Sequence, residues 1–127
     1  MRFDHAGIAT DDAAALAEQY AALFDCEIAH EERFDGMEIV FLDLGNGYFE
    51  LLEPVEGGAI ASYLDEHGPG IHHLAVETDD ATAALDRALE LGVEAIDEQP
   101  REGAWGHDVA FLHPKSTGGI LFEFVEH

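Results

Sequence analysis

Two stretches decide the fold of this chain, HAGIATDDAAAL at residues 5–16 and HLAVETDDATAAL at residues 73–85. They are copies of one pattern, and each copy opens with a histidine. Later in each half an apolar run carries a single glutamate, in YFELL at residues 48–52 and in LFEFV at residues 121–125. A repeated sequence predicts two similar units, in which equivalent residues can meet near one axis. The two histidines and two glutamates are therefore candidate ligands of one metal ion.

The first half predicts one strand, one helix and three more strands. Thr10 or Asp11 can cap the helix, and Asp35-Gly36 and Gly45-Asn46-Gly47 predict the two hairpin turns. The expected strands lie at 3–10, 27–34, 37–44 and 47–54. A connector over residues 55–70 contains a short helix at 59–67.

The second half repeats this order. Thr78 or Asp79 caps a helix that runs to Leu91 and ends at Gly92. The expected strands lie at 71–78, 93–97, 107–112 and 119–125, with a loop at 98–106. We therefore expect an α+β fold, in which two βαβββ repeats form a cupped, mostly antiparallel sheet around a metal site. One domain covers residues 1–127, with modules at about 1–54 and 71–127.

The charge of the chain is extreme. Asp and Glu number 28 against five Lys and Arg, which gives a net charge of −23. Such a chain repels itself in dilute buffer, and molar salt screens that repulsion. The chain has the apolar content of an ordinary globular protein but only one lysine. This combination favours adaptation to a salty cytoplasm, as in a halophilic organism. Nucleic acid and anionic membranes are unsuited as partners. Without a signal peptide or membrane span, the expected location is cytoplasmic.

The candidate metal ligands are His5, Glu50, His73 and Glu123. Each glutamate lies on a strand with mostly apolar neighbours, where a carboxylate without a partner is costly and a metal would remove that cost. Two imidazoles and two carboxylates suit a divalent ion and leave two of six positions for a substrate. His72 competes with His73, but aligning Asp4-His5 with His72-His73 assigns the ligand to His73.

Three motifs resemble a known family: residues 60–64 leading into 70–75, residues 103–106, and residues 111–123. The chain resembles the vicinal-oxygen-chelate superfamily (glyoxalase, bleomycin-resistance and dioxygenase proteins) over nearly its full length, and within it the methylmalonyl-CoA epimerases. The His72-His73 pair and the His113-Pro114-Lys115 run are the most diagnostic features. The resemblance implies a divalent cofactor bound by His5, Glu50, His73 and Glu123. Co²⁺ is expected, with Mn²⁺, Ni²⁺, Zn²⁺ or Mg²⁺ as alternatives.

The resemblance also implies an activity, the interconversion of the R and S epimers of methylmalonyl-CoA. One base removes the C2 proton, the metal stabilises the enolate, and a second group returns a proton on the other face. Glu123 and Glu38 are the candidate catalytic residues; Glu38 follows from its apolar neighbours Val40 and Leu42. Lys115, the only lysine, and Ser116 are the candidates for binding the substrate. A homodimer is expected, because small domains of this type commonly pair.

Two other functions remain open from the sequence. Glyoxalase I, a metal-dependent isomerase, can use the same two-His, two-Glu set, but that branch usually has an Asp-Pro-Asp-Gly type of turn at the place of His113-Pro114-Lys115. A metal-free ligand-binding module of the same fold is the second alternative, and retention of four ligands argues against it. A dioxygenase fits less well, because that chemistry usually uses two histidines and one carboxylate on iron.

Overall fold

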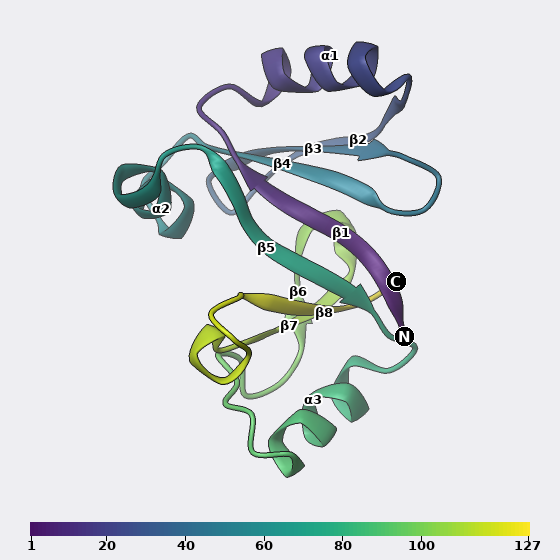
Figure 1. Cartoon of the computed structure of the whole chain (residues 1–127), viewed down its shortest axis with the longest axis vertical. Coiled ribbons are helices and arrows are strands. Elements are labelled where there is room, and N and C mark those ends of the chain that lie inside the picture. The colour runs from purple at the N-terminus through teal and green to yellow at the C-terminus, as the bar shows by residue number, and fades with distance from the viewer. The chain divides into compact units, whose positions relative to one another are not determined.

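A computed structural model describes all 127 residues and contains two compact units. The first unit comprises residues 5–72, and the second comprises residues 1–4 and 73–127. Along the chain, the predicted order of strand, helix and three strands occurs twice, with a short helix between the two copies (Figure 1). The βαβββ repeat predicted from the sequence is therefore confirmed.

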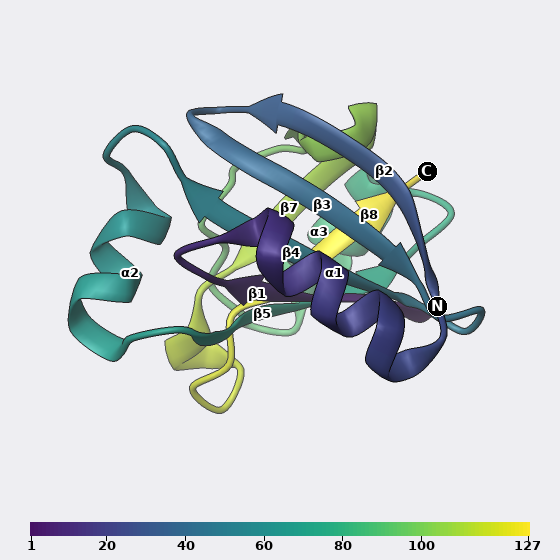
Figure 2. The same cartoon turned by 90° about the horizontal axis from the view of Figure 1, so that it is seen from above.

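The first unit is a four-stranded arrangement covered on one face by a helix. Strands run in the order β2-β3-β4-β1, with β1 parallel to β4 and the other pairs antiparallel. Helix α1 packs on one face of β3 and β4 (Figure 2). Its elements are β1 (Arg2–Ala9) from residue 5 onward, α1 (Ala13–Phe24), β2 (Glu27–Phe34), β3 (Met37–Asp43) and β4 (Tyr48–Pro54).

Both predicted hairpin turns of the first unit are present. Asp35 (φ 51°) and Gly36 (φ 75°) have left-handed backbone conformations, which a two-residue turn between twisted strands requires. In the second turn the Leu44 N–H donates to the Gly47 carbonyl at 3.0 Å. The connector helix α2 (Ala59–His67) has the predicted bounds and ends at Gly68, whose N–H donates to the Leu64 carbonyl.

The second unit repeats this arrangement. Its strands run in the order β5-β8-β7-β6, with β5 parallel to β8, and α3 packs against β7 and β8. The Gly92 (φ 86°) end of α3 is as predicted. Its elements are β5 (Gly70–Glu77), α3 (Ala81–Glu90), β6 (Arg101–Glu102), the 3₁₀ turn η1 (Ala104–Gly106), β7 (Asp108–Leu112), the 3₁₀ turn η2 (Pro114–Ser116) and β8 (Phe122–Glu126).

The sequence placed the strand before β7 wrongly. Residues 93–97 form only an isolated bridge, between Ala95 and Leu112, whereas β6 lies inside the segment expected to be a loop. A tight turn explains the difference, because the Gly103 N–H donates to the His107 carbonyl at 2.8 Å and folds the residues before it onto β7. A side chain at Gly103 would meet Val109 at 2.8 Å, so this approach requires glycine.

The two helix caps also differ from the prediction. Asp12 and Asp80 are the N-cap residues, one or two positions later than expected, and their carboxylates accept from Ala15 and Ala83. A glutamate at the end of the last strand of each unit adds a second acceptor: Glu53 accepts from the Ala13 N–H and Glu126 from the Ala81 N–H, both at 2.8 Å. Each helix N-terminus is thus bound by two carboxylates, which its dipole favours.

Each unit buries an apolar layer between its helix and its strands. In the first unit Ala13 and Ala17 of α1 lie against Val40, Leu42 and Leu51. In the second unit Leu85 and Ala88 of α3 lie against Ala110 and Leu112. None of the three α-helices combines the length and hydrophobicity needed to cross a bilayer.

Candidate functional site

In the first unit, β1 and β4 bring His5 and Glu50 together. Parallel pairing sets Gly7 opposite Glu50, so that His5 lies two residues away on the same face. The His5 Nε2 and Glu50 Oε1 atoms are 3.2 Å apart, and both side chains are buried. Phe41 is the cross-strand partner of Glu50, and its ring meets the His5 ring edge-on with centroids 5.7 Å apart.

The second unit builds the same arrangement from β5 and β8. Ala75 lies opposite Glu123, and His73 is again two residues away. The His73 Nε2 and Glu123 Oε1 atoms are 3.5 Å apart, and both side chains are buried. Phe111 is the cross-strand partner of Glu123 and meets the His73 ring edge-on at 5.5 Å. The repeat seen in the sequence therefore extends to the register and to an aromatic neighbour.

The chemistry of these residues fits a divalent metal. Each unit contributes one imidazole and one carboxylate, and all four side chains are at least nine-tenths buried. Two donors that bind one ion at about 2.1 Å from adjacent positions are about 3 Å apart, close to the separation in each pair. Each unit is thus a candidate His/Glu metal-binding element.

The structure does not bring Glu38 together with His5 and Glu50. Strand alternation places Glu38 on the face of Val40 and Leu42, which packs against α1, whereas Phe41 points to the face of His5. The Glu38 side chain is 47% exposed and its Oε1 lies 3.7 Å from Arg33 Nε. The apolar surroundings expected for this carboxylate are therefore absent.

Lys115 and Ser116 both bind Glu94. The Lys115 Nζ lies 2.9 Å from Glu94 Oε2, and Ser116 Oγ accepts from the Glu94 N–H at 3.0 Å. Hydrogen bonding to the Lys115 ammonium lowers the pKa of the Glu94 carboxyl. His113 Nδ1 accepts from the Lys115 N–H, as expected for a turn residue before Pro114. In this structure η2 is thus connected to the segment after α3 by an ion pair and a hydrogen bond to Glu94.

The two adjacent histidines have different surroundings. His73 lies against Phe111 and Glu123, whereas the ring of His72 lies against Tyr63 at 5.0 Å. Of the two, only His73 is the counterpart of His5 in register and in neighbours. This agrees with the alignment of the two repeats.

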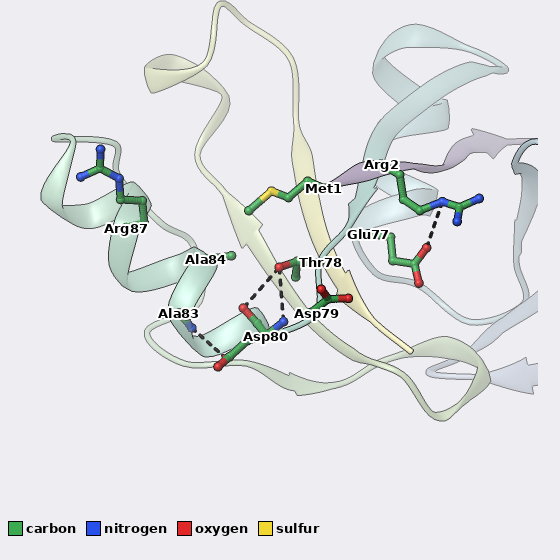
Figure 3. A pocket seen from close by; sticks show the side chains of 9 residues that line it. All are labelled: Met1, Arg2, Glu77, Thr78, Asp79, Asp80, Ala83, Ala84 and Arg87. Atoms are coloured by element: carbon green, nitrogen blue, oxygen red, sulfur yellow. Dashed lines mark hydrogen bonds and ion pairs between the residues drawn. The ribbon is translucent and has the colours of Figure 1, made fainter.

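A separate cavity of about 540 Å³ lies in the second unit and contains neither His–Glu pair. Figure 3 shows Arg2 reaching Glu77, at 3.5 Å, and Thr78 contacting Asp80. Beside it, Asp4, Glu77 and His127 each place one donor atom within 4.8 Å of the others. Arg2 pairs with Glu77, and His127 contacts Asp4 at 2.5 Å, so these carboxylates already have cationic or hydrogen-bonding partners.

Sequence reasoning missed three residues beside the pairs: Phe41, Phe111 and Arg101. The Gly45-Asn46-Gly47 turn could have identified Phe41, because a hairpin closed at Leu44 and Gly47 sets residue 41 opposite residue 50. Nothing comparable marks Phe111, since a longer irregular segment separates β7 from β8. Arg101 fell inside a segment taken for a loop.

Comparison with known proteins defines the class first. Residues 4–111 match the Glyoxalase/Bleomycin resistance protein/Dioxygenase superfamily. The chain belongs to this superfamily, and its α+β plan of two βαβββ repeats is the vicinal-oxygen-chelate fold.

Within that class the chain is similar to epimerases. It is 39% identical to the ethylmalonyl-CoA/methylmalonyl-CoA epimerase of Cereibacter sphaeroides, over 98% of this chain and 97% of that protein. The crystal structure of methylmalonyl-CoA epimerase from Mycobacterium tuberculosis matches with a TM-score of 0.93 at 34% identity, covering 98% and 87% of the two chains. A variant of the Streptomyces coelicolor methylmalonyl-CoA epimerase, in complex with 2-nitronate-propionyl-CoA, matches with a TM-score of 0.93 at 36% identity, covering 99% and 96%.

Proposed function

We propose that this protein is a methylmalonyl-CoA epimerase, an isomerase that interconverts the two epimers at C2. The observation that carries the proposal is the pair of equivalent buried His–Glu elements, His5–Glu50 and His73–Glu123. The chain that contains them is similar over its full length to an ethylmalonyl-CoA/methylmalonyl-CoA epimerase. Proton transfer at a carbon between a thioester and a carboxylate needs charge stabilisation and at least one positioned base.

The proposed metal ligands are His5, Glu50, His73 and Glu123, with the two units contributing one pair each. A divalent cation bound there would act as a Lewis acid toward the negative charge that develops on the thioester oxygen. Co²⁺ is our choice of native metal. Metal analysis of the purified protein, followed by activity of the stripped protein reloaded with Co²⁺, Mn²⁺, Ni²⁺, Zn²⁺ or Mg²⁺ in turn, tests both the requirement and the identity.

Glu123 is the proposed base on one face of the substrate. Its carboxylate has two oxygens, so one can bind a metal while the other accepts a proton. Glu38 remains the sequence-based candidate for the second face, although its strand face points toward α1. Glu38→Gln tests it. A loss of about 10²–10⁴ in epimerisation supports the role, and an unchanged rate removes Glu38 from the mechanism.

Lys115 and Ser116 are the proposed substrate-binding residues from the sequence. For Lys115 to bind the substrate, its ammonium has to exchange Glu94 for a substrate anion. Both side chains are more than half exposed, so a ligand in solution can reach them. The Michaelis constant of Lys115→Met for methylmalonyl-CoA tests this. An increase supports the assignment, and an unchanged value leaves Lys115 a structural residue of η2.

Glyoxalase I is not favoured, because similar proteins from Cereibacter sphaeroides, Mycobacterium tuberculosis and Streptomyces coelicolor are named as epimerases. A metal-free binding module also fits less well, since all four candidate ligands are present and buried. Neither alternative has an observation of its own in this chain. Metal analysis tests the metal-free module, and an assay with methylglyoxal and a thiol tests glyoxalase I.

Four further properties belong to the proposal. We expect a homodimer, which light scattering tests, and a cytoplasmic location, which fractionation of the source cells tests. We expect adaptation to high salt, which activity in molar KCl tests. We also expect both units to unfold cooperatively as one domain. Coincident transitions by circular dichroism and by fluorescence of Trp105 would support one domain, and two separate transitions would contradict it.

The deciding experiment is deuterium incorporation at C2 of methylmalonyl-CoA in heavy water at molar salt, with metal-loaded and chelator-stripped protein. Metal-dependent exchange coupled to interconversion of the epimers establishes the activity. No exchange with folded, metal-loaded protein rejects the epimerase. The same sample is then assayed with methylglyoxal and a thiol, the substrates of the glyoxalase reaction.

A further inference from the structure

Basic side chains are rare here, and four of the five have ion-pair partners that do not belong to either His–Glu pair or its aromatic neighbour. Arg33 lies opposite Glu38 in the β2–β3 ladder, on the face toward α1. The other three are exposed cations with a carboxylate partner elsewhere, Arg2 with Glu77, Arg87 with Glu90 and Lys115 with Glu94.

Arg101 differs from these four in its register. It is the cross-strand partner of Val109, and directly opposed residues of an antiparallel pair point to the same face. Val109 shares its face with Phe111, and Phe111 is the cross-strand partner of Glu123. Strand geometry alone therefore places Arg101 on the face of the second unit that carries His73 and Glu123.

Contacts connect Arg101 to that pair. Its guanidinium carbon lies 5.7 Å from the centroid of the Phe111 ring, within cation–π range. The same ring meets His73 edge-on at 5.5 Å. Arg101 is thus one aromatic ring away from the candidate metal ligand, and its side chain is 51% exposed and accessible to a ligand.

Asp97 fixes the position of the Arg101 guanidinium by a hydrogen bond. Its Oδ1 accepts from Arg101 Nε at 3.0 Å, while its Oδ2 accepts from the Phe111 N–H at 2.8 Å. Asp97 itself is 14% exposed. The bond to Nε leaves the two terminal amino groups of Arg101 outside this contact. Their planar fork matches the two oxygens of a carboxylate or phosphate.

We propose that Arg101 binds an anionic group of the acyl-CoA substrate, either the acyl carboxylate or a phosphate of the coenzyme A moiety. This inference rests on the proposed epimerase function. It adds Arg101 to Lys115 as a candidate cation for the substrate; Lys115 is paired with Glu94 in this structure. The chain has few cations with which to attract an anionic substrate, and this one is beside the site.

The test compares Arg101→Met with a matched control, Arg87→Met. Both changes remove an arginine that is at least half exposed and pairs with one carboxylate. Arg87, however, belongs to α3, which packs on the face of β7 opposite to Phe111. Loss of a charge-assisted forked contact predicts a Michaelis constant for methylmalonyl-CoA raised roughly tenfold to a hundredfold. The turnover number should stay within about threefold. Arg101→Lys keeps the charge without the fork and should be intermediate.

A truncated substrate separates the two sources of the anion. Methylmalonyl-pantetheine keeps the acyl carboxylate but lacks the phosphates of coenzyme A. A rise in the Michaelis constant of Arg101→Met with both substrates identifies the acyl carboxylate. A rise with methylmalonyl-CoA alone identifies a phosphate. Unchanged constants with both substrates, in variants with unchanged circular dichroism, overturn the proposal.

Failure of the epimerase function is recognised separately. If the wild-type protein turns over neither substrate, calorimetry measures the binding of free coenzyme A and of methylmalonate to the wild-type and Arg101→Met proteins. If coenzyme A or methylmalonate binds the variant more weakly, Arg101 is part of an anion-binding site even though the protein is not an epimerase. Equal binding of both ligands to the two proteins rejects the site as well.

Discussion

Glu50 and Glu123 occupy equivalent register positions in the two units, but we propose different roles for them. Glu50 acts only as a ligand, whereas Glu123 is also a base. Glu123→Gln should therefore lower turnover by about 10²–10⁴, because an amide cannot accept the C2 proton. Glu50→Gln should stay within about tenfold, because its amide oxygen still coordinates. Turnover and C2 deuterium exchange at saturating metal measure both variants.

Metal content is the control for this pair of variants. Both proteins must bind the metal to the same stoichiometry before their rates are compared. Equal losses in Glu50→Gln and Glu123→Gln would contradict the division of roles, and would make Glu123 a ligand of the same kind as Glu50.

Individual residues show which parts of the candidate site could be predicted from the sequence. Matching repeat positions identified His5, Glu50, His73 and Glu123, and the structure pairs them as two equivalent buried elements. Alternation could not place Glu38, because residues 39–42 are buried on both faces of β3. A run that is apolar on both faces does not reveal which face carries a helix and which carries a site.

At the scale of elements, the N-terminus of α3 offers a comparison between adjacent aspartates. Asp80 caps the helix by accepting from the Ala83 N–H at 3.0 Å, whereas the sequence favoured Thr78 or Asp79. Asp80→Ala should lower the free energy of unfolding by about 1 kcal/mol, the usual cost of a lost cap. Asp79→Ala should change it by less than about 0.5 kcal/mol, as for an ordinary surface position. Urea unfolding at fixed molar salt measures both, and the reverse ranking would contradict the observed cap.

The caps also explain why boundaries were less predictable than elements. Thr10-Asp11-Asp12 and Thr78-Asp79-Asp80 each offer three adjacent residues that can cap a helix. The observed caps occur together with hydrogen bonds from Ala13 to Glu53 and from Ala81 to Glu126, both on distant strands. A local pattern contains no information about such contacts. The misplaced β6 depends instead on a local turn, in which the Gly103 N–H donates to the His107 carbonyl.

The η2 turn gives a prediction about pH. Its Lys115 lowers the pKa of Glu94 in the folded protein, so the unfolded chain binds a proton at this site at higher pH than the folded one. The pairing therefore stabilises the fold above the unfolded pKa of glutamate, and this contribution is lost as pH falls through the lowered folded pKa. Carboxyl-detected NMR should show a depressed Glu94 pKa in the wild type and an ordinary value in Lys115→Met. Identical titration curves would contradict it.

At the scale of the whole molecule, the net charge of −23 sets the response to salt. The Debye length falls from about 30 Å at 0.01 M salt to about 3 Å at 1 M. Repulsion within the protein, and between the protein and an anionic acyl-CoA, acts over the longer range. A contact such as the one proposed for Arg101 acts at hydrogen-bond distance. Raising salt from low levels should therefore raise the unfolding temperature and lower the Michaelis constant together.

The measurement is a KCl series from about 0.01 M to 1 M, with thermal unfolding and methylmalonyl-CoA turnover on the same protein. Sucrose serves as the control, because it stabilises compact proteins by exclusion from their surface without screening charge. Sucrose should raise the unfolding temperature but leave the Michaelis constant unchanged, whereas KCl should improve both. A Michaelis constant that stays flat or rises with KCl, in protein shown by circular dichroism to be folded throughout, would mean that charge repulsion does not limit substrate binding. The acidic surface would then act on folding alone.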